Sequence, residues 1–480
     1  MSTAIAAMLD KVKRVTVMGL GRFGGGIGAA RFFAEAGKEV IVTDLLEAGE
    51  LEKSIVKLAD VPVIFHLGKH DVKDFTDTDL VLANQAARPD NPYLLEARKH
   101  GVRIITETGL ALALNRSPWL GVTGSGGKST TSAMLAAILS LRYPGTLFGG
   151  NIGGSLLTRV GNHPASAPVV AELSSFQLIH IAPQLAAGQI PSPKVAVVTN
   201  LAPNHLDWHT DLDEYYSAKK NLVQFQKPED WTILNADDPE LAHWIDGCPG
   251  RVIATSLSDT GRADSCHVEG EDIALRLDGK NAFTLPARSI RLPGKHNLRN
   301  AVQAVAAGYA FCGDAKAVTK GVGEFSGLPH RLENSGEAGG RTFINDSKST
   351  TPDAAILALG SFTMPCILIA GGYDKQSPFD RLGQAIQQHA DGLVLVGEAA
   401  DRIRHAVESA AQSRPDEKGR LKIVECGADF DKAVRAAFGM APVGGIVLLS
   451  PACASWGMFS NYEERGERFR QLAKEIAREC

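Results

Sequence analysis

The sequence predicts an α/β protein built from several mainly parallel sheets, and three observations lead to that fold class. Short, nearly continuous apolar runs such as RVTVMG at 14–19 and CILIAGG at 366–372 have the composition of strands buried on both faces. Segments rich in Ala, Leu, Glu and Lys separate most of these runs, as in parallel sheets covered by helices. The length of 480 residues is too great for one domain and, at roughly 150 residues per domain, favours about three.

Apolar runs that we expect to form strands follow one another along the whole chain. They are 14–19, 39–44, 79–84, 102–106, 119–124, 168–173, 194–200, 231–237, 341–346, 366–372, 392–397 and 445–450. The stretch 259–292 alternates short polar and apolar residues with turn signals, which predicts a small antiparallel excursion. One domain boundary is expected at Asn115-Arg116-Ser117-Pro118 and another near Gly327-Leu328-Pro329. The predicted domains are 1–115, 116–326 and 327–480.

The composition excludes several classes of function. Fifty basic and 54 acidic residues give a net charge of -4, which excludes a generally basic nucleic-acid-binding protein. No stretch approaches the roughly 18 uninterrupted apolar residues of a membrane span, and the N-terminus has no signal-peptide pattern. Seven cysteines without CxxC spacing indicate neither a zinc ribbon nor a disulfide framework, and they suggest a reducing compartment. We therefore expect a soluble, cytoplasmic protein with no nucleic-acid partner and no membrane insertion.

A glycine-rich loop, Gly19-Leu20-Gly21-Arg22-Phe23-Gly24, lies between the first expected strand and a helical segment at 27–37. The next expected strand ends in Asp44, so the loop and the acid together form the GxGxxG fingerprint of a dinucleotide-binding unit. Glycines there let the backbone approach a diphosphate at a helix N-terminus. Taken alone, the loop is also compatible with a tight structural turn or with another diphosphate ligand, such as a UDP-sugar.

A second loop, GVTGSGGKSTT at 121–131, follows an expected strand and precedes a helical segment at 132–141. Its backbone N–H groups can form an anion nest, and Lys128 can reach the β- and γ-phosphates of ATP. Ser129 or Thr130 can ligate Mg²⁺. A strict Walker loop has glycine where Val122 stands, so this loop is a variant. A dehydrogenase needs no ATP loop, whereas a ligase acting on a nucleotide-linked substrate uses both loops.

Candidate metal ligands follow two of the expected strands of the middle region. Glu172 stands near the carboxyl end of one strand, and His205 and Asp207 follow another. An expected helix at 211–225 then carries Lys219 beside a second lysine. Each residue alone is more readily explained without a function, the glutamate as a salt-bridge partner and the histidine as a core or surface residue. Together beside an ATP loop, they favour a Mg²⁺ site.

An ordered set of motifs covers nearly the whole chain. It consists of TGSGGKSTT, GGNIG, ELSSFQL, NLAPNHLDWH, SAKKNL, LPGKHNLRNA, GLPHRLE, INDSKSTTP and LLSPACASWGMF. This set resembles the Mur ligases of peptidoglycan synthesis. The resemblance implies a Rossmann-like N-terminal domain that binds the UDP end of the substrate and a central P-loop-type ATP-binding domain with a mainly parallel sheet. It also implies a C-terminal Rossmann-like α/β domain that receives the amino acid.

The resemblance also implies a reaction and its partners. ATP phosphorylates the carboxylate of UDP-N-acetylmuramoyl-L-alanine, and the amine of glutamate attacks the resulting acyl phosphate. Mg²⁺, as two ions, and a cationic lysine screen the negative charge of the phosphates and the oxyanion. We expect D-glutamate as the amino acid and a monomeric enzyme. L-glutamate, or a sibling Mur-type ligase with another nucleotide-linked carboxylate, stays an alternative.

Site residues are carried over from the family's motifs position by position. The catalytic and metal-binding set is Lys128, Ser129, Glu172, His205 and Lys219, the last as a carbamate, whose negative charge can hold Mg²⁺. ATP contacts are Thr123, Gly124, Ser125, Gly126, Gly127, Lys128, Ser129, Thr130, Asn297, Asn300, Arg331 and Asp346. Contacts to the UDP substrate are Gly19, Leu20, Gly21, Arg22, Phe23, Asp44 and Asn151. Glutamate contacts are Lys348, Thr350, Lys375, Ser455 and Tyr462. For Lys220 we expect a solvated helix position.

Some positions depart from the family's pattern, and other functions compete. Gly126 replaces the usual asparagine of the phosphate loop, and Asn84-Gln85-Ala86 replaces a frequent SPG. A folate polyglutamylating ligase would lack the first glycine loop, and a Rossmann oxidoreductase would leave 121–131 unexplained. A nucleotide-binding regulator that has lost its chemistry would not be expected to retain the catalytic lysines, Glu172, His205 and Asp346 together.

Overall fold

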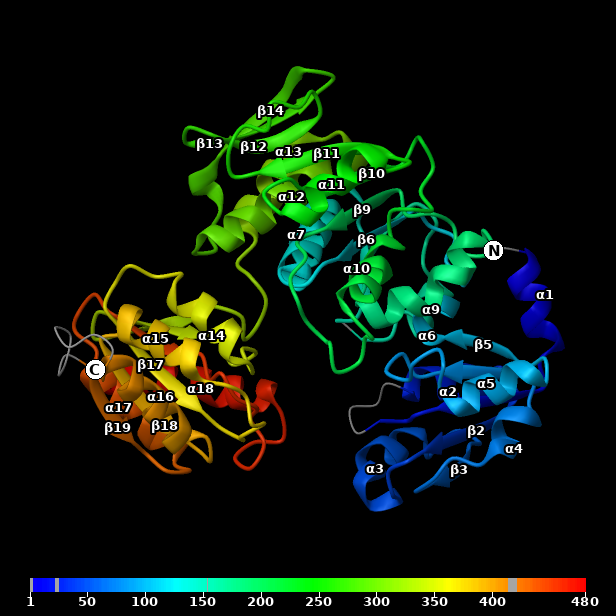
Figure 1. Ribbon diagram of the computed structural model, residues 1–480, viewed down its shortest axis with the longest axis horizontal. Coiled ribbons are helices and arrows are strands. Elements are labelled where there is room, and N and C mark those ends of the chain that lie inside the picture. Colours follow the sequence, from blue (N-terminus) through cyan, green and yellow to red (C-terminus); the bar gives the residue numbers. More distant parts are fainter. Residues whose placement is uncertain (1–2, 22–25, 153, 413–420) are drawn as a thin grey trace. The chain divides into compact units, whose positions relative to one another are not determined.

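Three sheets organise the computed structural model, which describes residues 3–21, 26–152, 154–412 and 421–480 (Figure 1). The chain divides into two compact units. The first unit comprises 1–289 and 299–325 and holds the first two sheets, while the second comprises 290–298 and 326–480 and holds the third. The α/β class with mainly parallel sheets is thereby confirmed. The domain boundaries after residues 115 and 326 stay predictions.

The first sheet has five parallel strands in the order β3-β2-β1-β4-β5. They are β1 (Arg14–Met18), β2 (Glu39–Asp44), β3 (Ile64–Leu67), β4 (Leu80–Ala83) and β5 (Arg103–Thr106). Along β4, Leu80 and Leu82 belong to one core cluster, while Val81 and Ala83 belong to another, as the alternation of a strand covered on both faces requires. The strand order reverses between the neighbouring strands β1 and β4. Open α/β sheets bind ligands at such a position, beyond the carboxyl ends of the strands.

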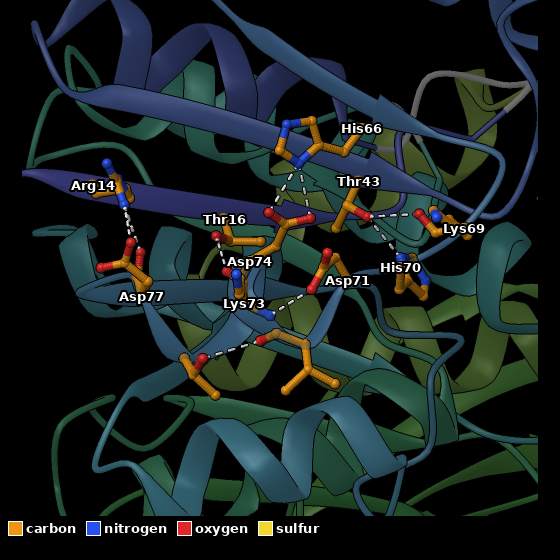
Figure 2. A network of polar contacts seen from close by, with 12 residues as sticks. Arg14, Thr16, Thr43, His66, Lys69, His70, Asp71, Lys73, Asp74 and Asp77 are labelled. Carbon is orange, nitrogen blue, oxygen red and sulfur yellow. Dashed lines mark hydrogen bonds and ion pairs between the residues drawn. The ribbon is translucent and has the colours of Figure 1, made fainter.

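Helices and a polar network cover this sheet. The helices are α1 (Thr3–Lys11), α2 (Ile27–Glu35), α3 (Ala48–Ile55), α4 (Val72–Thr76) and α5 (Pro92–Lys99). Figure 2 shows how polar side chains fix α4 and the loop before it to the strands. His66 Nδ1 lies 2.9 Å from an oxygen of the buried Asp74, and Thr43 Oγ1 lies 2.8 Å from His70 Nδ1. Each buried polar group there gains a partner, which offsets its desolvation.

The second sheet has nine strands in the order β14-β13-β12-β11-β10-β9-β6-β8-β7. They are β6 (Trp119–Thr123), β7 (Leu147–Gly150), β8 (Val169–Glu172), β9 (Val195–Val198), β10 (Trp231–Asn235), β11 (Arg251–Ser256), β12 (Ser265–Glu269), β13 (Asp272–Leu277) and β14 (Lys280–Pro286). The pairs β12–β13 and β13–β14 are antiparallel and the others are parallel, so the antiparallel excursion expected within 259–292 is present.

Helices accompany the second sheet along most of its length. They are α6 (Glu107–Leu114), α7 (Lys128–Arg142), α8 (Leu157–Val160), α9 (Ser175–Ala186), α10 (Leu212–Lys220), α11 (Pro239–Trp244), α12 (Lys295–Cys312) and α13 (Ala315–Glu324). Every residue of α6 after Glu107 is buried, and α6 packs against α8 and α9. Helix α7 begins four residues before the segment expected at 132–141, and α10 ends at Lys220 rather than continuing to 225.

The third sheet has six strands in the order β15-β16-β20-β17-β18-β19, of which only the β15–β16 pair is antiparallel. They are β15 (Glu333–Ala338), β16 (Arg341–Asn345), β17 (Cys366–Gly371), β18 (Gly392–Val396), β19 (Lys422–Glu425) and β20 (Ile446–Leu449). Helices α14 (Pro352–Leu359), α15 (Asp380–His389), α16 (Ala400–Gln412), α17 (Phe430–Met440) and α18 (Tyr462–Glu479) surround it. Within the part of the chain that the structure describes, no helix is long and apolar enough to cross a membrane.

Candidate active site

The phosphate-type loop 124–127 joins the carboxyl end of β6 to the start of α7. Gly124 and Gly127 have positive φ angles of 142° and 78°, which L side chains rarely adopt. A Cβ at Gly127 would lie 2.2 Å from Asn300 Oδ1, and one at Gly124 would lie 1.9 Å from Thr199 Oγ1. Both the backbone conformation and the close neighbours therefore require glycine at these two positions.

Lys128 is the first residue of α7, and its side chain turns back over the loop. Its Nζ donates to the carbonyl oxygens of Gly124 at 2.9 Å and Ser125 at 3.1 Å. No side chain caps the N-terminus of α7, so the first backbone N–H groups of the helix can receive an anion. The loop, the helix end and the lysine thus provide positive potential at one place.

Asn200, two residues after the end of β9, holds the loop in this shape. Its carbonyl oxygen accepts the Ser125 N–H at 2.8 Å, and its Oδ1 accepts the Gly126 N–H at 2.8 Å. Its Nδ2 in turn donates to the Gly126 carbonyl oxygen at 3.2 Å. The sequence prediction missed Asn200. Its place at the carboxyl end of the apolar run 194–200 is the signal that could have found it.

Glu172 ends β8, beside β6, and is buried with 1% of its surface exposed. Its Oε1 accepts a hydrogen bond from Asn151 Nδ2 at 2.9 Å. Its Oε2 is buried and has no hydrogen-bond partner among the residues that the structure describes. Leaving a buried carboxylate oxygen unpaired is costly, so this oxygen is suited to a cation. Ser174 caps α9 two residues later by accepting the Gln177 N–H, which fixes where the strand ends.

Lys219 lies in the last turn of α10 and is 1% exposed. Its Nζ donates to the Gly124 carbonyl oxygen at 2.9 Å and lies 4.4 Å from the ring centroid of Tyr215. Burial lowers the pKa of Lys219 well below its usual value, and the charge of Lys128 lowers it further. The lowered pKa favours the neutral amine more than in an exposed lysine. Lys220, by contrast, is exposed and lies over the Trp244 ring, as expected for a surface lysine.

His205 stands on the exposed loop before α10, with a positive φ of 55°. Its ring centroid lies 4.9 Å from that of Phe176. The pKa of His205 is lowered, first by partial burial of the ring and then by the charges of Lys219 and Lys128. A lowered pKa favours the neutral imidazole, which is the form that binds metal ions.

The side chains near the phosphate loop supply only some of the ligands that a metal ion needs. Within the described ranges, no three Asp, Glu, His or Cys side chains gather as a ready-made metal cluster. The unpaired Oε2 of Glu172 is nevertheless a buried anionic ligand in need of a cation. A hard cation such as Mg²⁺ prefers oxygen ligands, so phosphate oxygens and a carbamate at Lys219 would complete such a set.

The first glycine loop lies at the carboxyl end of β1. Gly19 and Gly21 have φ angles of 86° and 74°, and a Cβ at Gly19 would lie 2.6 Å from Asn84 Nδ2. The Asp44 carboxylate accepts the N–H groups of Leu20 at 2.8 Å and Gly21 at 3.0 Å. The acid therefore orders the loop's own backbone. The predicted contacts Arg22 and Phe23 lie outside the described residues, and Asn151 lies beside Glu172.

In the second unit, Asp346 follows β16 and is 2% exposed. It accepts the Leu332 N–H at 3.2 Å and the Ser450 hydroxyl at 2.7 Å. Burial raises its pKa to about 6, although Ser349, Ser450 and Arg331 act in the opposite direction. Asn297, also predicted to contact ATP, is buried and donates to the Pro293 carbonyl oxygen at 2.7 Å.

The predicted glutamate contacts form two groups. Lys348 Nζ lies 5.7 Å from the ring centroid of Tyr462, whose pKa is raised by burial, and the Thr350 N–H donates to the Lys348 carbonyl oxygen. Lys375 Nζ lies 4.9 Å from the ring centroid of Trp456, which directly follows the buried Ser455.

The comparisons with known proteins agree with this geometry. Residues 122–308 match the Mur ligase middle domain, and residues 330–453 match the Mur ligase glutamate ligase domain. A protein of Roseiflexus sp. (strain RS-1), named UDP-N-acetylmuramoylalanine--D-glutamate ligase, is 39% identical over 474 residues, which cover 96% of this chain and 98% of the relative. A protein of the same name from Symbiobacterium thermophilum is 37% identical and covers 97% and 98%. The chain belongs to the Mur ligase family.

Solved Mur ligase structures share the fold. The UDP-N-acetylmuramate-alanine ligase of Thermotoga maritima superposes with a TM-score of 0.60 at 20% identity, covering 97% of this chain and 99% of that one. A pseudomurein peptide ligase type C from Methanothermus fervidus gives a TM-score of 0.56 at 16% identity, with 97% and 100% covered. The family resemblance expected from the motifs is confirmed.

Each unit of this Mur ligase contains one further residue that stabilises segments with predicted site residues. Tyr215, four residues before Lys219, places its hydroxyl 3.0 Å from Ser125 Oγ in the phosphate loop. In the second unit, the buried Arg465 donates to the Ser347 hydroxyl at 3.0 Å and to the Cys453 carbonyl oxygen at 3.1 Å. An arginine on the core-facing side of an amphipathic helix is the signal that could have found Arg465.

Proposed function

We propose that this Mur ligase joins D-glutamate to UDP-N-acetylmuramoyl-L-alanine with hydrolysis of ATP to ADP and phosphate, the activity that its relatives' names state for them. One observation supports this class of reaction. The buried Lys219, whose pKa is strongly lowered, donates a hydrogen bond from Nζ to a carbonyl oxygen of the phosphate loop. A pure nucleotide-binding module has no use for this costly arrangement, whereas a phosphoryl-transfer site can use a second basic group there.

The proposed chemistry has two steps. A carboxylate oxygen of the substrate attacks the γ-phosphorus of ATP, the bond to the bridging oxygen breaks, and ADP leaves. The amine of glutamate then attacks the carbonyl carbon of the acyl phosphate, an amide forms, and phosphate leaves with its oxygen while the amine loses a proton. Lys128 and the N–H groups at the start of α7 hold the β- and γ-phosphates through both steps.

Glu172, His205, Ser129 and Lys219 are the proposed ligands of two Mg²⁺ ions. The Mg²⁺ ions, when bound, neutralise phosphate charge and polarise the transferring phosphoryl group. The unpaired Oε2 of Glu172 and the lowered pKa of His205 support these roles. The other proposed ATP contacts are Thr123, Gly124, Ser125, Gly126, Gly127, Thr130, Asn297, Asn300, Arg331 and Asp346.

Lys219 is proposed to carry a carbamate. Its neutral amine attacks CO₂, a nitrogen–carbon bond forms, and one proton leaves, so a cation-forming group becomes an anion. The lowered pKa supports this step because only the unprotonated amine is a nucleophile. The carbamate oxygens can then bind Mg²⁺, which the ammonium form would repel.

The remaining contacts are proposed by region. Residues 1–115 bind the UDP substrate through Gly19, Leu20, Gly21, Arg22, Phe23 and Asp44, with Asn151 as a further contact from residues 116–326. Residues 327–480 bind glutamate through Lys348, Thr350, Lys375, Ser455 and Tyr462, and cations with hydroxyl donors suit a dicarboxylate. We propose that the protein is a cytoplasmic monomer. Light scattering of the purified protein would measure its molar mass and so test the monomeric state.

Phosphate release from ATP tests the proposal. The protein is incubated with Mg²⁺ and UDP-N-acetylmuramoyl-L-alanine in three parallel reactions, containing D-glutamate, L-glutamate or no amino acid. Turnover that depends on both the nucleotide substrate and D-glutamate is the expected result. Turnover with L-glutamate alone would keep the chemistry and change the substrate. No turnover with any amino acid, in a folded protein that binds ATP, would contradict the proposal.

A further inference from the structure

A loop of the first sheet makes direct contacts with the loop that carries His205. This loop, residues 84–90, follows β4. Its Ala86 carbonyl oxygen accepts the Trp208 Nε1–H at 2.7 Å, and its Ala87 carbonyl oxygen lies 2.8 Å from His180 Nε2. Both contacts join residues more than ninety positions apart in the chain, since their separations are 122 and 93.

Arg88 makes several further contacts with residues 208–214. Its guanidinium donates to the Trp208 carbonyl oxygen and pairs with the Glu214 carboxylate at 3.3 Å. It also lies 5.2 Å from the centroid of the Trp208 ring. We call Arg88, Trp208 and Glu214 the latch. The planar guanidinium uses one face for the ring and its edge for three acceptors, the Trp208 carbonyl oxygen and the carboxylates of Glu214 and Asp90, a combination that lysine cannot reproduce.

Glu214 connects the latch to the start of α10. Its carboxylate also accepts the Thr210 N–H at 2.8 Å and lies 3.3 Å from His209 Nδ1. The carboxylate favours a proton on Nδ1, so His209 Nε2 accepts the Ser175 hydroxyl, 2.9 Å away. The side chain of His209 is fully buried, and this chain of bonds ties the loop to the first turn of α9.

The latch lies close to two proposed metal ligands. Phe176 packs against Trp208 with ring centroids 4.5 Å apart and against His205 at 4.9 Å. On α10, Glu214 is in the first turn and Lys219 in the last, so the latch fixes the beginning of the helix that delivers Lys219. A displaced latch would therefore move both His205 and Lys219.

The other end of the loop lies at the proposed UDP site. Asn84 Oδ1 accepts the Ala86 N–H at 2.9 Å, and the Asn84 side chain lies against Gly19 of the first glycine loop. Only Ala87 lies between Ala86 and Arg88 in the sequence. A ligand that moves Asn84 would therefore also displace this short segment. Arg88, at the far end of the segment, contacts the loop that carries His205.

We propose that Arg88 is a positioning residue that couples ligand binding beside Asn84 and Gly19 to the placement of His205 and Lys219. The inference rests on the proposed function for the identity of the nucleotide-linked substrate. Arg88 touches none of the reacting atoms. Its contribution is to hold residues 205–214 in the arrangement that phosphoryl transfer needs, and displacements of about 1 Å in such sites cost about a hundredfold in rate.

Three variants test this role. Arg88→Ala removes the latch, and Arg88→Lys keeps the charge but not the paired geometry. Arg31→Ala is the matched control, because the Arg31 side chain is 28% exposed, as is that of Arg88, and pairs with Asp60 and Glu35 away from the loop. Arg88→Ala is expected to lower kcat by roughly tenfold to a hundredfold, with the KM for ATP changed less than about twofold. Arg88→Lys should recover part of kcat, and Arg31→Ala should retain the wild-type value.

Tryptophan fluorescence provides a readout without turnover. UDP-N-acetylmuramoyl-L-alanine is added in the absence of ATP, and Trp208→Phe identifies the share of the signal that comes from Trp208. The wild type and Arg31→Ala are expected to show a saturable change that Trp208→Phe lacks and that Arg88→Ala loses.

The two arms separate the possible failures. If the wild type turns over and Arg88→Ala matches Arg31→Ala in kcat and fluorescence, the positioning role is overturned. An Arg88→Ala variant that only melts earlier, with kcat and fluorescence unchanged below its melting temperature, overturns it as well. If the wild type gives the fluorescence change but no turnover, the proposed function fails. The positioning role of Arg88 is then judged by whether Arg88→Ala loses the fluorescence change that Arg31→Ala keeps. If the wild type shows neither, both fail.

Discussion

Lys219 and Lys220 are neighbours in sequence with opposite environments, one buried against the phosphate loop and the other exposed over Trp244. Lys219→Ala is expected to lower phosphate release by roughly a hundredfold or more, as loss of one charge-stabilising group in an active site does. Added formate or acetate should restore part of the activity by replacing the missing carboxylate. Lys220→Ala is the control and should keep near wild-type activity. Full activity of Lys219→Ala would contradict the carbamate role.

Carbamylation itself can be observed and should depend on pH. With carbon-13 bicarbonate, a carbamate resonance is expected in the wild type and in Lys220→Ala but not in Lys219→Ala. Because only the neutral amine reacts, the resonance should weaken as the pH falls and the amine takes up a proton. The lowered pKa of Lys219 shifts this loss to a lower pH than an ordinary lysine would show. A resonance that survives in Lys219→Ala would place the modification elsewhere.

Asp346 predicts a dependence of stability on pH. Its pKa is raised from 3.8 to about 6 in the folded protein, so the folded state binds more protons than the unfolded state between these values. Stability therefore decreases as the pH rises from about 4 to 6, by an amount on the order of 3 kcal/mol at 1.36 kcal/mol per pH unit. Asp346→Asn removes this titration and keeps an acceptor for the Leu332 N–H.

Urea unfolding of both proteins at pH 4, 5, 6 and 7 would measure the difference, since about 1 kcal/mol is resolved by such titrations. The wild type should lose stability relative to Asp346→Asn across this range. Parallel pH profiles for the two proteins would mean that Asp346 does not titrate between these values.

At the scale of elements, two adjacent glycines in the loop between β6 and α7 differ in how much space and conformational freedom they need. Gly127 has a positive φ, and an added Cβ would meet Asn300, whereas a Cβ at Gly126 would lie no closer than 3.6 Å to Asn200. Gly127→Ala is expected to cost about 1–3 kcal/mol of stability and to weaken binding of an ATP analogue. Gly126→Ala should change both much less. Calorimetric titration and thermal melts would measure the two quantities, and equal affinities for both variants would refute the argument.

Most central strands of the sheets could be predicted from sequence, but several other strands could not, and the central strand β11 was missed as well. Strands such as β4 and β20 are continuous apolar runs because helices cover both of their faces. The edge strands β3 and β19 lack such runs because they are partly exposed. Strand β7 has two glycines among its four residues, which gives no strand signal. For β3, β7 and β19, the pairing comes from the rest of the sheet rather than from a local sequence signal.

The prediction of the site was limited in the same way by contacts between segments that are distant in sequence. Motifs predicted Lys128, Glu172 and Lys219 as site residues because each stands at the end of a recognisable element. Asn200 and Arg88 were missed because their partners are distant in sequence, 74 positions for Asn200 with Gly126 and 126 positions for Arg88 with Glu214. Local periodicity contains no information about which loops meet, so such contacts need the folded structure.

At the scale of the whole molecule, each compact unit has its own buried core. Leu234 on β10 lies in the core of the first unit, and Leu448 on β20 lies in that of the second. Both side chains are 0% exposed, and both strands have a neighbour on each side. Units with separate cores are expected to unfold as separate cooperative steps rather than in one transition.

Differential scanning calorimetry of a matched pair of variants tests this expectation. Leu234→Ala and Leu448→Ala each remove the same buried atoms, at a cost of about 3–5 kcal/mol to the unit that contains them. Each variant should lower the temperature of one transition and leave the other in place. An ATP analogue should raise the transition that Leu234→Ala lowers, because ligands stabilise the part of a protein that binds them and the phosphate loop 124–127 belongs to the first unit. One transition that both variants shift equally would show instead that the two cores unfold together.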